Sequence, residues 1–119
     1  MKKIYVGHSK KYDYINELYN PIIESSLNDE YEFIFPHLGG TDFDSQKVIY
    51  ESDLFIAEVS HASLGLGIEI GRAEIQNKKI LCIYNEKKGG PSCLKHVNVD
   101  VLSYLDKEDM INKIKDYLK

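Results

Sequence analysis

The sequence predicts an α/β protein, a three-layer sandwich in which a flavodoxin/Rossmann-like parallel sheet of about five strands is flanked by helices. Short apolar runs alternate along the chain with segments of helical periodicity, which is the order expected of βαβ units. The run over 54–57 is apolar at every position, as in strands that are covered on both faces. With 119 residues, the chain is expected to fold as a single domain over 1–119.

The first third of the chain predicts a strand, a helix and a second strand. The apolar run over 3–7 is too short for a signal peptide and is expected to be the first strand. Apolar residues recur with a helical period over 14–28, where Pro21 is expected to kink or divide the helix. A second apolar run over 31–35 predicts a strand that ends at Pro36.

The middle of the chain predicts a strand–helix–strand unit. A loop rich in helix and strand breakers covers 36–44, and a short helix is predicted over 45–52. The unit that follows consists of a strand over 53–59, a helix over 65–77 and a strand over 79–84.

The last third predicts a loop over 85–92, an edge strand over 97–102 and a closing helix over 107–118. In open parallel sheets, ligands bind outside the carboxyl ends of the strands. We therefore expect the site on the loops that follow the strands. These loops cover 7–12, 36–44, 59–67 and 85–95.

Composition narrows the class of function. The net charge of −4 argues against a nucleic-acid surface, whereas backbone amides can still bind anionic small ligands. No apolar run approaches the ~20 residues of a membrane span. Cys82 and Cys93 are unclustered, which predicts reduced thiols in a cytoplasmic protein, and the four histidines lack metal-binding spacing. We expect no metal and no cofactor.

Gly65, Gly67 and Glu69 stand together at the start of the helix over 65–77. Glycines let the backbone approach a ligand closely, and the start of a helix presents free amides. A structural alternative stays open, because tight turns favour glycine and helix starts favour acids. Ile70 stands where a dinucleotide fingerprint needs its third glycine, so no dinucleotide site is predicted.

Residues 52–84 resemble the core motif of the nucleoside 2-deoxyribosyltransferase family, with the sequence SDLFIAEVSHASLGLGIEIGRAEIQNKKILCIY. Within that family they are most similar to the branch of 2′-deoxynucleoside 5′-monophosphate N-glycosidases. Ala62 and Lys79 stand where the motif has proline. The N-terminal half differs from the well-described hydrolases, so the resemblance carries the reaction class further than the substrate.

The resemblance implies that Glu69 is the nucleophile that attacks C1′ of a 2-deoxyribose. A carboxylate beside C1′ stabilises an oxocarbenium-like transition state and can form a covalent glycosyl-enzyme, which water or a second base resolves. Gly65 and Gly67 are then expected to clear space for the sugar.

Ser63 is expected to separate hydrolase from transferase. The resemblance implies an Asp at this position in the transferase branch, where it holds the 5′-hydroxyl, and a Ser in the hydrolase branch. An Asp would repel a 5′-phosphate, whereas a hydroxyl and helix-start amides donate to it. Ser63 is also a candidate N-cap, and the two roles are compatible.

Two further loops are expected to complete a phosphate cradle. Gly7, Ser9 and Lys10 lie at the end of the first strand, although the glycines of the relatives' loop are missing here; a solvated loop is the alternative. Ser92 resembles a loop serine that, in the hydrolase branch, reaches the phosphate of the neighbouring subunit. This implies a homodimer or higher homo-oligomer, with an ordinary turn residue as the alternative.

The position of the second carboxylate departs from the resemblance. The hydrolases place an Asp eight residues before the Asp that begins the central strand, here Asp53, and Ser45 stands at that position. Asp44 is the nearest acid, with Asp42 beyond it. We expect Asp44 to protonate the leaving base, or alternatively to cap the helix over 45–52.

Tyr5 and His37 complete the candidate substrate-binding residues. Tyr5 is expected to approach the sugar or the base, with strand packing as the alternative. His37 follows the second predicted strand and is a candidate contact for the nucleobase.

Together these features predict an enzyme that hydrolyses the N-glycosidic bond of a 2′-deoxynucleoside 5′-monophosphate, or of a related nucleotide, through a Glu nucleophile. Its partner is expected to be a small deoxynucleotide and not a nucleic acid or a membrane. A deoxyribosyltransferase that exchanges bases is one alternative. A non-catalytic nucleotide-binding or sensing module is another, favoured by the missing acid at position 45.

Overall fold

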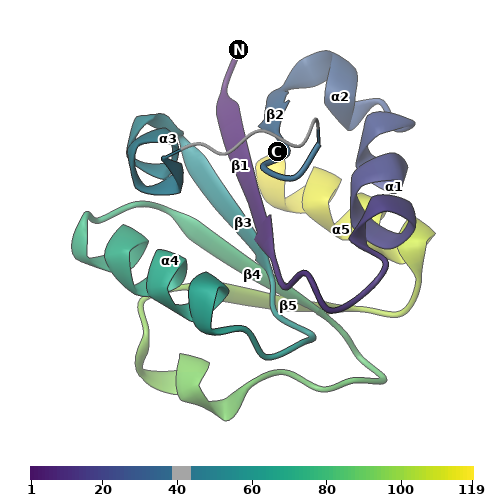
Figure 1. Ribbon diagram of the computed structural model, residues 1–119. Coiled ribbons are helices and arrows are strands. Elements are labelled where there is room, and N and C mark those ends of the chain that lie inside the picture. The colour runs from purple at the N-terminus through teal and green to yellow at the C-terminus, as the bar shows by residue number, and fades with distance from the viewer. Residues whose placement is uncertain (39–43) are drawn as a thin grey trace.

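The computed structural model describes residues 1–38 and 44–119. Its centre is a five-stranded sheet in which all neighbouring strands run parallel, in the order β2-β1-β3-β4-β5 (Figure 1). The strands are β1 (Lys3–His8), β2 (Glu32–Ile34), β3 (Leu54–Glu58), β4 (Ile80–Asn85) and β5 (Asp100–Tyr104). The predicted parallel α/β fold is confirmed.

Helices cover both faces of this sheet (Figure 1). The layer on one face consists of α1 (Asn20–Ile23), α2 (Leu27–Glu30) and α5 (Lys107–Leu118). The layer on the other face consists of α3 (Ser45–Glu51) and α4 (Leu64–Ile75). Two short segments complete the structure, the π-helix η1 (Ile15–Tyr19) and the 3-10 helix η2 (Ser92–His96).

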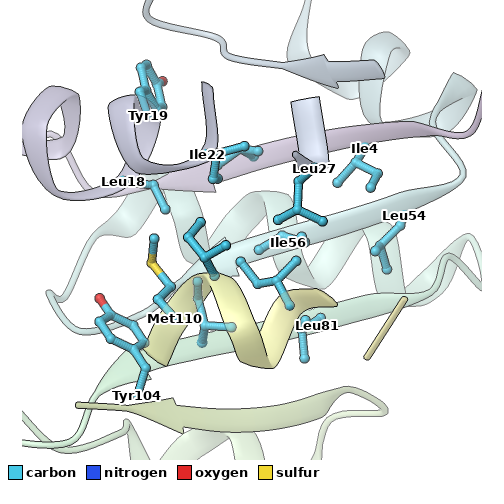
Figure 2. Close-up of a cluster of buried hydrophobic side chains, with 14 residues drawn as sticks. Ile4, Leu18, Tyr19, Ile22, Leu27, Leu54, Ile56, Leu81, Tyr104 and Met110 are labelled. Carbon is cyan, nitrogen blue, oxygen red and sulfur yellow. The ribbon is translucent and has the colours of Figure 1, made fainter. Parts of the chain in front are cut away.

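Each face of the sheet buries its own apolar cluster, because successive residues of a strand point to opposite faces. In β1, Ile4 and Val6 join the cluster beneath α1, α2 and α5, while Tyr5 between them joins the cluster beneath α3 and α4. Figure 2 shows the first cluster, in which strand side chains meet helix side chains such as Leu18, Ile22, Leu27 and Met110. Tyr5 is thereby placed on the face that carries α4.

The predicted helix over 14–28 is divided, but after Pro21 and not at it. η1 passes directly into α1, whose second residue is Pro21, and residues 24–26 then separate α1 from α2, which begins at Leu27. Proline has no N–H to donate and is tolerated in the first turn of a helix, which explains its place here.

The edge strand begins later than its predicted start at residue 97. β5 starts at Asp100 and pairs with β4, and the order of strands places it at the edge as expected. Val97 and Val99 instead pack against the cluster beneath α3 and α4 before the chain enters the sheet. Their apolar side chains, which predicted a strand, therefore pack against the core from a connecting segment.

Over the two described ranges, 1–38 and 44–119, we find no helix with the length and apolar character needed to cross a membrane. Cys82 is buried and Cys93 is exposed, and both are free thiols as predicted.

Candidate active site

The start of α4 forms an open helix terminus at the carboxyl end of β3. Ser63 is the N-cap, and its side-chain oxygen accepts the Leu66 amide at 3.3 Å. Among the described residues, a Cβ built on Gly65 or Gly67 meets no atom from outside its own turn of α4 within 4 Å. Packing within the described part of the chain therefore does not require these glycines, and the first turn of α4 is accessible.

Glu69 lies in the second turn of α4 and is half-buried. The Tyr5 hydroxyl donates a hydrogen bond to Glu69 Oε2 at 3.1 Å. The Tyr5 ring is buried and packs edge-on against Phe55, with ring centroids 5.3 Å apart. The carboxylate is thus tied to the centre of the sheet by a tyrosine that has little freedom to move.

Burial raises the pKa of Glu69, while hydrogen bonds from the side chains of Ser45 and Tyr5 and the nearby charge of Arg72 oppose that rise. Burial and the adjacent Glu69 also raise the pKa of Tyr5, so this phenol keeps its proton. The hydroxyl groups therefore act on Glu69 as donors that favour its ionised form.

Asp44 caps α3, which is one of the two roles predicted for it. Its carboxylate accepts the Lys47 amide at 3.3 Å at the start of α3, and the residue is exposed. It borders a hollow of about 410 Å³ whose lining includes Tyr50 and Gln76 but neither Ser45 nor Glu69. The structure therefore places the Ser45 hydroxyl, and not the Asp44 carboxylate, against Glu69. Asp42 lies outside the described residues.

The end of β1 and the loop that follows it hold three further predicted contacts to the phosphate. A Cβ on Gly7 would lie 2.6 Å from Phe55 Cε1 and 3.1 Å from Leu66 Cδ1, so this glycine is required by packing between β1, β3 and α4. Ser9 is buried, and its hydroxyl accepts the Lys11 amide at 3.1 Å. Lys10 is exposed.

His37 lies in an aromatic cluster that the sequence did not reveal. Its backbone amide donates to the Tyr19 hydroxyl at 3.2 Å, and that hydroxyl also pairs with His8 Nε2 at 2.6 Å. The rings of His8 and His37 meet edge to face, with centroids 5.1 Å apart. Burial lowers the pKa of His8 to about 4, so this ring is neutral at physiological pH.

A buried carboxylate, Glu58, joins the carboxyl ends of three strands. Its two oxygens accept the Ser60 amide at 2.7 Å and the Ser60 hydroxyl at 2.8 Å, and it also accepts the Tyr104 hydroxyl. Ser60 Oγ in turn accepts the Asn85 amide at 2.7 Å. The network fixes the loop that leads into Ser63. Glu58 lies within the motif of residues 52–84, and no pattern marked Tyr104.

Ser92 is exposed at the first residue of η2. Its neighbours Pro91 and Cys93 line a groove of about 530 Å³ that also includes Ser63 and Gly67. Glu69 is not among the groove's lining residues. The structure therefore brings the Ser92 segment toward the helix terminus rather than toward the carboxylate.

In the part of the chain that the structure describes, no group of three or more His, Cys, Asp or Glu side chains is placed to hold a metal ion. The groups that act on the Glu69 carboxylate include the hydroxyls of Tyr5 and Ser45 and the guanidinium of Arg72.

The order of the sheet defines the class of protein. It is an open, parallel α/β protein, with its candidate site at the carboxyl ends of the strands.

The sequence is similar to curated proteins over part of its length. A 5-hydroxymethyl-dUMP N-hydrolase from Danio rerio is 35% identical over 88 residues, which are 67% of this chain and 55% of that protein. Proteins of the same name from Branchiostoma floridae and Homo sapiens are 54% and 44% identical over 39 and 41 residues, which are 33% and 34% of this chain and 37% and 24% of those proteins. The alignments thus span about half, or less, of the length of these relatives.

Solved structures share the fold. The CMP N-glycosidase BcmB of Clostridium botulinum superposes with a TM-score of 0.73 at 23% identity, over 98% of this chain and 99% of that one. A conserved protein from Enterococcus faecalis V583 gives 0.69 at 17% identity, over 98% and 99% of the two chains. No family model matches the chain. The predicted resemblance is confirmed: the chain is homologous to nucleotide N-hydrolases and has the fold of an N-glycosidase.

Proposed function

We propose that this protein hydrolyses the N-glycosidic bond of a 2′-deoxynucleoside 5′-monophosphate, with Glu69 as the nucleophile. The observation that carries the proposal is the half-buried Glu69 carboxylate, which the Tyr5 hydroxyl holds at 3.1 Å beside an open helix start. The homologues named 5-hydroxymethyl-dUMP N-hydrolase support a nucleotide as the substrate.

The chemistry follows from one carboxylate beside the anomeric carbon. Glu69 attacks C1′ as the bond to the base breaks, and the resulting glycosyl ester is then cleaved by water at C1′. Glu69 must be ionised to attack. The donors from Tyr5 and Ser45 favour this state against the opposing effect of burial.

The 5′-phosphate is expected at the start of α4. Free amides and the positive end of the helix dipole favour an anion there, and α4 is 12 residues long. Ser63 accepts the Leu66 amide and keeps its own hydroxyl hydrogen for a phosphate oxygen. Lys10 is an exposed cation on the neighbouring loop. A serine in place of an acid at position 63 favours a phosphorylated substrate, and with it hydrolysis, over transfer from a free nucleoside.

We also propose that the active unit is a homodimer. The support is the outer face of α4, where Leu64 and Ile75 are 83% and 81% exposed, together with the exposed Ser92 beside the groove. Light scattering on the protein as it elutes from a size-exclusion column measures its oligomeric state and tests this proposal. A monomer in the wild type contradicts the homodimer, and a dimer that survives L64E combined with I75E contradicts the outer face of α4 as its interface.

A product assay on a panel of deoxynucleotides tests the activity. Wild-type protein is expected to release free base and 2-deoxyribose 5-phosphate. Glu69→Gln is expected to lower turnover by about 10³-fold or more, while the surface variant Glu51→Gln retains it. Turnover that survives Glu69→Gln shows that the nucleophile is wrongly assigned. Exchange into an added free base would instead favour the transferase.

A nucleotide-binding module without turnover is the second candidate. It is favoured by the hydroxyl of Ser45 at the position where the hydrolases carry an acid. Tight binding of deoxynucleotides by the wild type, with no product and with affinity unaffected by Glu69→Gln beyond the loss of charge, would support this candidate.

A further inference from the structure

We propose that His8 is a positioning residue that holds the loop after β2, and with it His37, in place for binding of the nucleobase. This inference rests on the proposed function and concerns the base side of the same site. It is carried by a continuous series of hydrogen bonds, which runs from the His37 backbone amide to the end of β1 through two buried side chains, Tyr19 and His8.

The partners of His8 determine which of its ring nitrogens carries the proton. Nδ1 lies 2.8 Å from the Ser9 carbonyl oxygen, and a carbonyl oxygen only accepts hydrogen bonds, so Nδ1 is the donor. Burial lowers the pKa of His8 to about 4, which keeps the ring neutral at physiological pH. In a neutral imidazole with a proton on Nδ1, the other nitrogen, Nε2, is an acceptor.

The same reasoning orients the Tyr19 hydroxyl. Its oxygen lies 2.6 Å from His8 Nε2, and because that nitrogen accepts, the hydroxyl donates its proton to the ring. The lone pairs of the oxygen remain available, and one of them accepts the His37 amide at 3.2 Å. Every hydrogen bond in the series thus points the same way, from the His37 amide toward the Ser9 carbonyl, and adjacent bonds of such a series strengthen one another.

Aromatic packing leaves the His8 ring little freedom to turn. The residue is 6% exposed, and its ring stacks on Tyr14, with ring centroids 4.3 Å apart and an angle of 28° between the planes. The rings of Tyr19 and His37 meet it edge to face, each with its centroid 5.1 Å from that of His8. A ring held in this way keeps Nε2 directed at the Tyr19 hydroxyl, which in turn keeps the His37 amide in place.

His8 lies on the opposite face of the sheet from the nucleophile. Ile4 and Val6 of β1 point to the cluster beneath α1, α2 and α5, and His8 follows them in the alternation of the strand. Tyr5, which donates to Glu69, points to the other face. Loss of the His8 hydrogen bonds is therefore expected to weaken binding of the base and to leave the attack on C1′ unchanged.

The tautomer of His8 can be measured on the wild-type protein. ¹⁵N NMR of the imidazole rings distinguishes a protonated from an unprotonated ring nitrogen, and the His8 signals are assigned by their loss from His8→Gln. At neutral pH we expect a protonated Nδ1 and an unprotonated Nε2. A protonated Nε2 overturns the proposal, whether or not the protein cleaves a nucleotide.

Two amide side chains of different length test the role of His8 in binding. Gln reaches the position of Nε2 and can still accept from Tyr19, whereas Asn reaches only the position of Nδ1. With the deoxynucleotide that the wild type cleaves fastest, His8→Asn is expected to raise KM by about 10-fold while kcat stays within about 2-fold. His8→Gln is expected to keep KM within about 3-fold of wild type. A KM that is unchanged in His8→Asn, or raised equally in both variants, contradicts the proposal.

Product inhibition separates the two ends of the nucleotide. In His8→Asn, the inhibition constant of the free base is expected to rise about as much as KM. That of 2-deoxyribose 5-phosphate is expected to stay within about 2-fold, because the Ser9 hydroxyl still accepts the Lys11 amide. Equal weakening of both products would place the effect on the loop after β1 and overturn the proposal. His96→Asn, at an exposed histidine of η2, is the matched control and is expected to keep the wild-type constants.

The failure of the proposed function gives a different result. If the wild type cleaves no nucleotide, that function fails, and calorimetry with the deoxynucleotide that binds most tightly still tests His8. The affinity is then expected to fall by about 10-fold in His8→Asn and by no more than about 3-fold in His8→Gln. Equal affinities in the two variants overturn the proposal.

Discussion

Removal of the Tyr5 hydroxyl is expected to raise the pKa of Glu69 further. The hydroxyl donates to the carboxylate at 3.1 Å, and a hydrogen bond to a charged group contributes about 1.5–3 kcal/mol. Glu69 is only half-buried, so the lower end of this range applies to the stabilisation that the ionised carboxylate loses. The pKa moves upward, because the lost donor stabilises the ionised form of the carboxyl group.

Tyr5→Phe keeps the ring that packs against Phe55 and removes only the donor. Two measurements report the shift: a ¹³C NMR titration of the Glu69 carboxyl carbon, and the acidic limb of kcat/KM against pH. Both are expected to move to higher pH, and kcat/KM on the acidic limb is expected to fall by about 10-fold, because Glu69 acts when ionised. Tyr19→Phe is the matched control, since the Tyr19 hydroxyl pairs with His8. A limb that stays in place in Tyr5→Phe, or moves equally in both variants, refutes the reasoning.

Three further predictions concern the frame around the site. Gly7→Ala is expected to cost about 1–3 kcal/mol of stability in urea denaturation, because its Cβ would lie 2.6 Å from Phe55 Cε1. Gly67→Ala, whose Cβ meets no described atom from outside its own helix turn within 4 Å, is expected to keep the wild-type free energy of unfolding or raise it by up to about 1 kcal/mol, while lowering kcat/KM. Similar losses of stability in Gly7→Ala and Gly67→Ala would contradict this. Glu58→Ala is expected to lower the free energy of unfolding by about 3 kcal/mol or more, since the donors of Ser60 and Tyr104 lose their acceptor. Tyr104→Phe is expected to lower it by about 1–2 kcal/mol, and equal losses would argue against a shared network. Burial lowers the pKa of His8 to about 4, so between pH 4 and about 6.5 the unfolded chain binds a proton that the folded chain does not. The free energy of unfolding is therefore expected to rise with pH over this window, by up to about 3 kcal/mol. His8→Gln should flatten that rise, and an unchanged slope would exclude His8 as its source.

The fold was predictable from the sequence because its signals are local. The uninterrupted apolar runs of β3 and β4 indicate strands buried on both faces, and the helical period of 107–118 gives α5 at its observed bounds. The misplaced start of β5 has the same origin: Val97 and Val99 alternate as in a strand, but they lie in a connecting segment and pack, partly buried, against the cluster beneath α3 and α4. Periodicity indicates that a side chain is buried and does not specify which surface buries it.

The site was predictable only where its residues are neighbours in the sequence. Ser63, Gly67 and Glu69 lie within one turn and the helix that follows, so a motif contains all three. The hydrogen bond from Tyr5 to Glu69 joins residues 64 positions apart, and the bond from Tyr104 to Glu58 joins residues 46 apart. Such pairs depend on how parallel strands are set in register and how helices pack upon them, and no local pattern marks them.

The two hydroxyl groups that hydrogen-bond to Glu69 differ in how strongly the fold constrains them. Tyr5 has a buried ring that packs against Phe55 and is part of the core, so this contact changes only at a cost in stability. Ser45 is half-buried at the first residue of a seven-residue helix, where another polar side chain is tolerated without repacking the sheet. On the proposed mechanism, the core therefore fixes the position of the nucleophile, whereas the start of α3 can change without disturbing it. Ser45→Ala is expected to lower the free energy of unfolding by less than Tyr5→Ala does in urea denaturation. Equal losses in the two variants would show that the start of α3 is constrained as strongly as the core.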